Sequence, residues 1–199
     1  MKILVVGASG TIGQSVVKEL SQRHEVITAG HKSGDVRVDI EDIDSIKKMY
    51  QEVKDLDAVA VAAGRAQFGL FTEMTQERHM IGIKSKLMGQ VNLVLEGVKH
   101  LNDKGSFTLI TGILNREPIL SASNAALVNG AIDAFVKAAA IDLPRGLRIN
   151  SVSPTVLAES MDNYGPYFRG YKPVSAYDVG LAYSKSIEGG HTGQVYIVG

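Results

Sequence analysis

The chain contains no cysteine, no tryptophan, only five prolines and no excess of charge of either sign. Without cysteine, disulfides, thiolate nucleophiles and sulfur-ligated metals are excluded. Lysine plus arginine and aspartate plus glutamate each number 21, so no long-range field favours nucleic acid or an anionic membrane. No apolar run reaches the roughly 18 residues of a spanning helix, and the five histidines lack metal-ligand spacing. We therefore expect a soluble, cytoplasmic protein without a metal.

Short β-branched runs alternate with longer helical patterns along the 199 residues. This alternation is typical of βαβ units whose parallel sheet is covered by helices on both faces. The pattern predicts an α/β fold of the doubly wound Rossmann type, as one domain over residues 1–199. Seven strands are expected, near residues 2–6, 25–29, 36–38, 57–62, 106–111, 147–152 and 194–198.

Two long helices are also predicted. Apolar residues spaced by three and four indicate one helix from Met80 to Val98. A second runs from about residue 121 to 143 and is rich in alanine. Small side chains allow close approach of another helix, which suits a subunit interface or packing within one chain equally well. The stretch from Thr155 to Lys172 is the most irregular and follows a late strand, where open α/β sheets place ligands.

A glycine-rich turn directly follows the first expected strand. Its three glycines allow a tight turn, close approach to a pyrophosphate, and close packing of helix on strand. The helix that follows offers unpaired N–H groups to phosphate charge. We expect a dinucleotide to contact Gly7, Ser9, Gly10, Thr11, Ile12 and Gly13.

The end of the second strand indicates which dinucleotide is preferred. A site selective for NAD places an acid there, on the ribose 2′-hydroxyl. This chain has His31, Lys32 and Ser33 instead, three groups that can donate to a 2′-phosphate. We predict that NADP(H) is preferred over NAD(H); the alternative is a solvated turn with no such role.

These residues resemble the short-chain dehydrogenase/reductase family, and the resemblance continues to the carboxyl terminus. Val38-Asp39-Ile40 resembles the segment whose aspartate binds adenine, and Ala62-Ala63-Gly64 resembles the Asn-Ala-Gly motif. Ser153-Pro154-Thr155 is similar to the Pro-Gly turn beside the nicotinamide. The resemblance implies cofactor contacts from Asp39, Ile40, Ala62, Ala63, Gly64, Pro154, Thr155 and Val156.

The catalytic motif of that family is not conserved in this chain. Its tyrosine acts as general acid/base, and a lysine four residues later lowers the tyrosine pKa. Leu120 and Asn124 occupy those two positions. Leucine has no titratable proton and asparagine no charge, although Asn124 can still hydrogen-bond a cofactor ribose. The enzyme assignment is therefore left open by the sequence.

Two residues are the candidates for a substitute active site. Thr111 lies near the family's catalytic serine, and Lys86 stands where the family has its relay asparagine. A lysine ammonium can stabilise an oxyanion or, if desolvated, act as an acid. Tyr164, Tyr167 and Tyr171 are further phenols, with covering of a pocket as their more ordinary role.

The sequence is compatible with two main functions. The first is an NADP(H)-dependent oxidoreductase acting on an unknown small carbonyl or alcohol through a non-standard active site. The second is a non-catalytic NADP(H)-binding sensor or interaction module; a pocket for another nucleotide or metabolite is a third, weaker possibility. The family resemblance also implies a homodimer or homotetramer.

Overall fold

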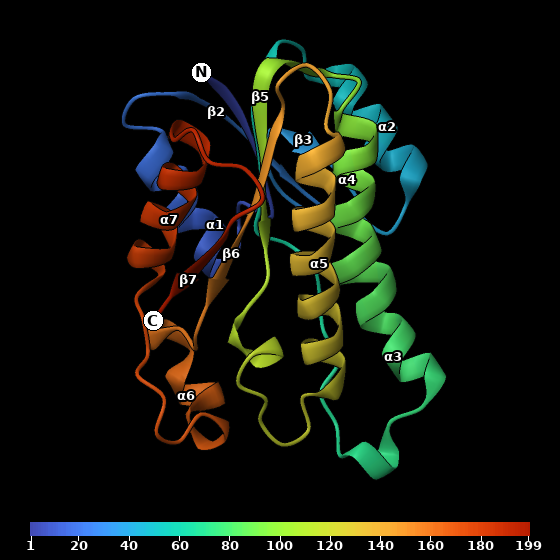
Figure 1. Cartoon of the computed structure of the whole chain (residues 1–199), viewed down its shortest axis with the longest axis vertical. Helices are drawn as coiled ribbons and strands as arrows, with labels where there is room; N and C mark the ends of the chain where they lie inside the picture. Colours follow the sequence, from blue (N-terminus) through green and yellow to red (C-terminus); the bar gives the residue numbers. More distant parts are fainter.

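The computed structural model describes residues 1–199 as one parallel seven-stranded sheet with helices on both faces (Figure 1). The order β3-β2-β1-β4-β5-β6-β7 confirms the doubly wound Rossmann-type fold. The strands are β1 Lys2–Val6, β2 Glu25–Gly30, β3 Val36–Arg37, β4 Leu56–Val61, β5 Leu101–Ile110, β6 Arg148–Pro154 and β7 Val195–Val198.

The helices are α1 Thr11–Leu20, α2 Ile43–Glu52, α3 Gln76–Gly82, α4 Gly89–Gly97, α5 Ser123–Asp142, α6 Met161–Tyr164 and α7 Ala176–Glu188. Between α3 and α4 lies η2, a π-helical segment over Ile83–Met88. The single long helix expected from Met80 to Val98 is therefore continuous in direction but interrupted in its hydrogen bonding. Short 3₁₀ turns occupy Phe71–Glu73, Ile113–Asn115, Ala158–Ser160 and Gly165–Tyr167.

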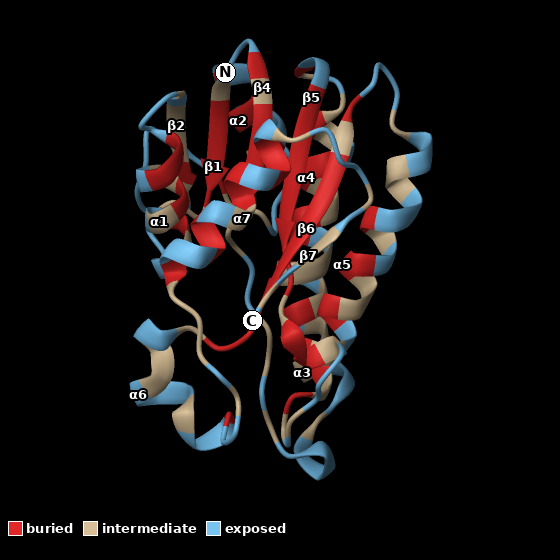
Figure 2. Ribbon diagram, turned by 60° about the vertical axis from the view of Figure 1, so that its left-hand side comes forward, coloured by how far each residue is buried: buried red, intermediate tan, exposed pale blue.

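Alternation along the strands builds two cores, one on each face of the sheet. Leu4 and Val6 of β1 face α2, α4 and α5, whereas Ile3 and Val5 face α1 and α7. Both faces are therefore apolar, and the central strands β1, β4 and β6 are buried over nearly all of their length, as Figure 2 shows. This pattern explains why a parallel sheet reads as continuous apolar runs rather than as alternation.

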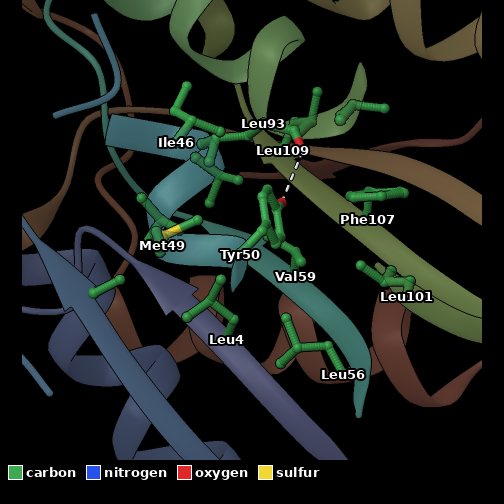
Figure 3. Close-up of a cluster of buried hydrophobic side chains, with 14 of the residues drawn as sticks. Leu4, Ile46, Met49, Tyr50, Leu56, Val59, Leu93, Leu101, Phe107 and Leu109 are labelled. Atoms are coloured by element: carbon green, nitrogen blue, oxygen red, sulfur yellow. Dashed lines mark hydrogen bonds between the residues drawn. The ribbon is translucent and has the colours of Figure 1, made fainter. Parts of the chain in front are cut away.

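The larger core contains one buried phenol. Tyr50 of α2 is fully buried among aliphatic side chains, and its hydroxyl donates to the backbone oxygen of Leu93 at 2.7 Å (Figure 3). Burial raises the pKa of this phenol far above its usual value, so Tyr50 stays neutral. The hydrogen bond links α2 to α4 across the core.

Helix α5 is a core helix despite its composition. By length and composition it could cross a membrane, although polar residues such as Asn129, Asp133 and Lys137 interrupt its apolar residues. It packs beside β6 and buries three polar side chains, Asn124, Asn129 and Asp133, on its inner face. These contacts account for α5 as part of the fold.

Candidate functional site

The carboxyl ends of the parallel strands lie together along one side of the sheet. In the middle of that side, β1 and β4 are neighbours. The chain leaves β1 toward β2 on one side and returns to β4 on the other, which makes this the switch point where such sheets bind ligands. Two cavities open there. One of about 480 Å³ lies toward β2 and one of about 460 Å³ lies toward β5 and β6, and Arg65 lines both.

The glycine turn joins β1 to α1 with little space to spare. A Cβ added at Gly13 would lie 2.0 Å from the backbone oxygen of Gly7, so helix and turn touch backbone to backbone. Gly10 is the N-cap of α1, no side chain caps that end, and no acid lies in its first turn. The helix terminus is thus available to an anionic group.

The cavity toward β2, here the adenosine-side cavity, gathers most of the residues predicted there. Gly7, Ser9, His31, Lys32, Ser33, Asp39, Ile40 and Ala63 line it. His31 Nδ1 lies 3.5 Å from Asp39 Oδ2. Asp35, the nearest acid after β2, accepts instead from the N–H and hydroxyl of Thr28, which lowers its carboxyl pKa. No acid therefore lines the cavity from the turn at the end of β2.

An ion pair between Glu41 and Arg65 crosses this cavity and was not foreseen. Arg65 donates to Glu41 Oε1 at 2.8 Å, and its backbone N–H donates to Ser85 Oγ at 3.1 Å. The hydrogen bond from Arg65 holds the pKa of Glu41 below its usual range. The available signal was a charged residue placed directly after the glycine of the Ala62-Ala63-Gly64 segment.

The cavity toward β5 and β6, here the reaction cavity, holds the two candidate catalytic residues. Lys86 and Thr111 both line it, and Lys86 Nζ donates to the Thr111 backbone oxygen at 3.3 Å. The Thr111 hydroxyl is buried and donates weakly to Val152 at 3.4 Å. Ile12, Gly64, Pro154, Thr155 and Val156 line the same cavity, so predicted residues from five chain segments meet here.

Lys86 is unusual in its electrostatic environment. Lys86 is half-buried and lines the cavity, and burial lowers the Lys86 pKa to about 8, against a smaller opposing effect of Asp133. It stands in the π-helical segment η2, a distortion frequent at functional sites. Gly64, at φ +114°, lies so close that a Cβ there would be 2.7 Å from Lys86 Cα.

The inner face of α5 adds polar groups that sequence reasoning missed. Asn129 donates to the Gly112 oxygen at 3.3 Å and lines the reaction cavity, while its own amide oxygen has no partner. Asp133 accepts from Asn115 and from Ser151. The signal was present as polar residues four apart on a helix otherwise read as alanine-rich.

Several predicted residues line neither cavity. Gly10, Thr11, Gly13 and Ala62 belong to the turn and strand ends beneath the groove. Asn124 is fully buried; its oxygen accepts from the Gln67 N–H at 2.8 Å and its nitrogen donates to the His79 oxygen at 2.9 Å. Its amide is already used within the protein, so its placement gives no support to a cofactor contact.

Comparison with known proteins identifies the family. A sequence family described as enoyl-(acyl carrier protein) reductase, of the short-chain dehydrogenase type, matches residues 4–175. The chain belongs to the short-chain dehydrogenase/reductase family. It is 25% identical over 186 residues to YmfI of Bacillus subtilis (strain 168), described as an uncharacterized oxidoreductase, with 80% of this chain and 76% of that protein covered.

Solved structures agree with this family assignment. The crystal structure of the protein lin1944 from Listeria innocua is 55% identical and has a TM-score of 0.99, with both chains covered completely. A small-chain dehydrogenase in complex with NADPH is 26% identical and has a TM-score of 0.88, covering 100% of this chain and 96% of that one.

The residue that the sequence pattern aligned with the family's tyrosine, Leu120, faces solvent. Leu120 is 88% exposed, and the next residue, Ser121, has φ +65°. The loop therefore turns just before α5 and directs Leu120 away from the reaction cavity. Neither Leu120 nor Asn124 lines the reaction cavity.

Proposed function

We propose that the chain is an NADP(H)-dependent oxidoreductase acting on a small carbonyl or alcohol, with Lys86 as the proton donor and acceptor. The observation that carries this proposal is that Lys86 lines the reaction cavity, where its Nζ donates to the Thr111 backbone oxygen, and burial lowers its pKa to about 8. A general acid works best when its pKa lies near the working pH. The other cation of this cavity, Arg65, does not release its proton in that range.

The groove fits a dinucleotide. The N-terminus of α1 has no side-chain cap, and at Gly13 this helix touches the backbone of the glycine turn. One cavity lies on each side of the ends of β1 and β4. When bound, a nicotinamide cofactor supplies a hydride to a carbonyl carbon or accepts it back. Lys86 Nζ then gives its proton to the carbonyl oxygen, leaving a neutral amine and an alcohol. In the oxidative direction the neutral amine takes that proton.

Thr111 and Asn129 position the substrate oxygen, which is a carbonyl oxygen before reduction and a hydroxyl after it. The Thr111 backbone oxygen holds Lys86 Nζ at 3.3 Å, and the Thr111 hydroxyl lies in the same wall. The Asn129 amide oxygen, which has no partner, is an acceptor for the product hydroxyl. One group therefore donates to the substrate oxygen and one accepts from the alcohol.

The role of Lys86 is tested by Lys86→Gln. We expect NADPH affinity to remain and kcat for carbonyl reduction to fall by about 10²-fold or more, the usual contribution of a positioned acid. Lys84→Gln is the matched control, since Lys84 is exposed and lines neither cavity. In the wild type, kcat for reduction should fall above pH 8 as Lys86 loses its proton. Unchanged turnover in Lys86→Gln would refute the assignment.

The cofactor preference is a second part of the proposal. His31, Lys32 and Ser33 line the adenosine-side cavity, and a relative of 26% identity was crystallised with NADPH. Lys32→Ala should weaken NADPH binding about tenfold, as expected for loss of a charge-assisted hydrogen bond, and leave NADH binding unchanged. Lys48→Ala on α2 is the control. Equal affinity of the wild type for NADPH and NADH would end the claim of preference.

One alternative is favoured by a specific observation. Leu120 faces solvent and Asn124 is occupied within the protein, which suits a non-catalytic NADP(H)-binding sensor or interaction module. That function predicts tight nucleotide binding, no turnover of a broad carbonyl panel, and partner binding that changes on adding nucleotide. Turnover that depends on Lys86 would exclude it.

We further propose a cytoplasmic homodimer or homotetramer assembled through α4 and α5. These helices lie side by side (Figure 1), and their outer surfaces expose Leu95, Leu127 and Ile141 at 57%, 49% and 84%. Exposed apolar side chains on neighbouring helices favour an interface.

A further inference from the structure

A third cavity, of about 360 Å³, lies beside the reaction cavity and is called here the outer cavity. It is lined by Phe68, Ile119, Ser121, Tyr164, Tyr167 and Phe168, together with a glycine. None of these side chains carries a charge at neutral pH. The volume is that of a site for a small organic molecule.

Three separate chain segments build the outer cavity. The loop after β4 provides Phe68, and its Gly69 N–H donates to the Ser121 oxygen at 3.0 Å. The loop before α5 provides Ile119 and Ser121. Leu120, which lies between them, points into solvent. The outward turn that directs Leu120 away from the reaction cavity thus also shapes this wall.

The third segment is the region around α6, which is anchored and not free. Phe168 is 7% exposed and packs edge-on against Tyr171 with ring centroids 5.4 Å apart. The Tyr171 hydroxyl donates to the Glu117 oxygen at 3.3 Å. Tyr164 and Phe68 approach each other with ring centroids 6.4 Å apart, so aromatic rings from two segments face the cavity.

The outer and reaction cavities adjoin each other. Phe68, Tyr164 and Phe168 line both. The reaction cavity carries two cations, Arg65 and Lys86, and no acid. A molecule spanning both therefore has an oxygen at Lys86 and an uncharged, apolar body among the aromatic rings. A carboxylate on that body would lose its water with no cation to compensate it.

We propose that the substrate is a neutral aromatic ketone or aldehyde, whose rings lie in the outer cavity and whose carbonyl lies in the reaction cavity. This inference rests on the proposed function and names the substrate class of the same site. Aromatic rather than aliphatic bodies are favoured because three ring-bearing side chains surround the junction, where offset and edge-to-face contacts add to simple apolar burial.

Binding and turnover are to be measured separately with four probes. They are 2-acetonaphthone, its carboxylate analogue 6-acetyl-2-naphthoate, octan-2-one and acetone, each added to the full chain with NADP⁺ for calorimetric binding and with NADPH for reduction. We expect 2-acetonaphthone to bind about tenfold tighter than octan-2-one or the carboxylate. Equal affinities for 2-acetonaphthone and octan-2-one would overturn the inference.

Two variants locate the site. Tyr164→Ala should weaken 2-acetonaphthone binding about fivefold, the order expected for an aromatic contact, and the control Tyr177→Ala should leave it unchanged. Both tyrosines are exposed, at 45% and 56%, but Tyr177 lines none of the three cavities. Ile119→Lys should reverse the preference toward 6-acetyl-2-naphthoate. Equal effects of Tyr164→Ala and Tyr177→Ala would overturn the placement.

The outcomes separate this inference from the proposed function. If 2-acetonaphthone binds at Tyr164 but is not reduced, the oxidoreductase proposal fails and the aromatic site stands. If octan-2-one is reduced with the same kcat/KM as 2-acetonaphthone, the chemistry stands and the substrate class is overturned.

Discussion

Replacing Lys86 by methionine should stabilise the protein in a way that depends on pH. Burial lowers the Lys86 pKa from its ordinary value of 10.5 to about 8. Between these values the unfolded chain binds more protons than the folded one, so the free energy of unfolding of the wild type rises with pH. Below pH 8 the wild type carries the full cost of a buried ammonium. Above pH 10.5 that cost is absent.

The structure sets the magnitude of this effect. One pKa unit corresponds to about 1.4 kcal/mol, so a fall from 10.5 to about 8 implies about 3 kcal/mol. Methionine has a similar shape and no charge. The stability advantage of Lys86→Met over the wild type should therefore shrink by about 3 kcal/mol between pH 7 and pH 11, whatever its packing contributes.

Urea unfolding of both proteins at a series of pH values measures this difference. Other lysines and tyrosines titrate over the same range, but they are common to both proteins and cancel in the comparison. Lys84→Met is the control, and its difference from the wild type should not vary with pH. A constant difference between Lys86→Met and the wild type from pH 7 to pH 11 would show that the Lys86 ammonium is not desolvated, and would remove the physical basis of its catalytic role.

Three further outcomes follow from the packing. Gly13→Ala should lower the free energy of unfolding by about 3 kcal/mol and reduce nucleotide binding, because its Cβ would meet the Gly7 backbone oxygen; a native-like melt with intact binding would argue against this contact. Tyr50→Phe should cost about 1 to 3 kcal/mol in chemical denaturation, since the Leu93 oxygen loses its buried donor; no loss would mean that water replaces it. Leu127→Glu should reduce the mass measured by light scattering to that of one chain, and an unchanged mass would place the interface elsewhere.

The sheet could be predicted because its strands are buried on both faces, which leaves short β-branched runs between helical patterns. Its boundaries could not all be predicted. β5 begins at Leu101, whereas the sequence pattern suggested residue 106, because Asn102, Asp103 and Lys104 are exposed and lack a strand pattern. Their strand assignment depends on the irregular pairing of β4 with β5, which only the folded chain defines.

The cofactor groove was more predictable than the reaction cavity for a related reason. Glycine spacing reports directly on backbone geometry, so the turn after β1 could be placed from sequence. The π-helical segment over Ile83–Met88 leaves no comparable mark, since the apolar spacing from Met80 to Val98 is also that of an ordinary helix. Neither the lowered pKa of Lys86 nor the approach of Asn129 follows from spacing alone.

The two halves of the groove also differ in how substitution affects them. The cofactor half depends on backbone contacts, such as the approach of Gly13 to Gly7, which a side chain at Gly13 would disrupt. The chemical half depends on individual side chains, such as Lys86, Thr111 and Asn129, which line the reaction cavity. A desolvated lysine in this cavity can carry out proton transfer, because the nicotinamide half of the groove remains where the fold places it. For this reason the Lys86→Gln and Lys86→Met variants are the decisive tests of the proposed oxidoreductase function.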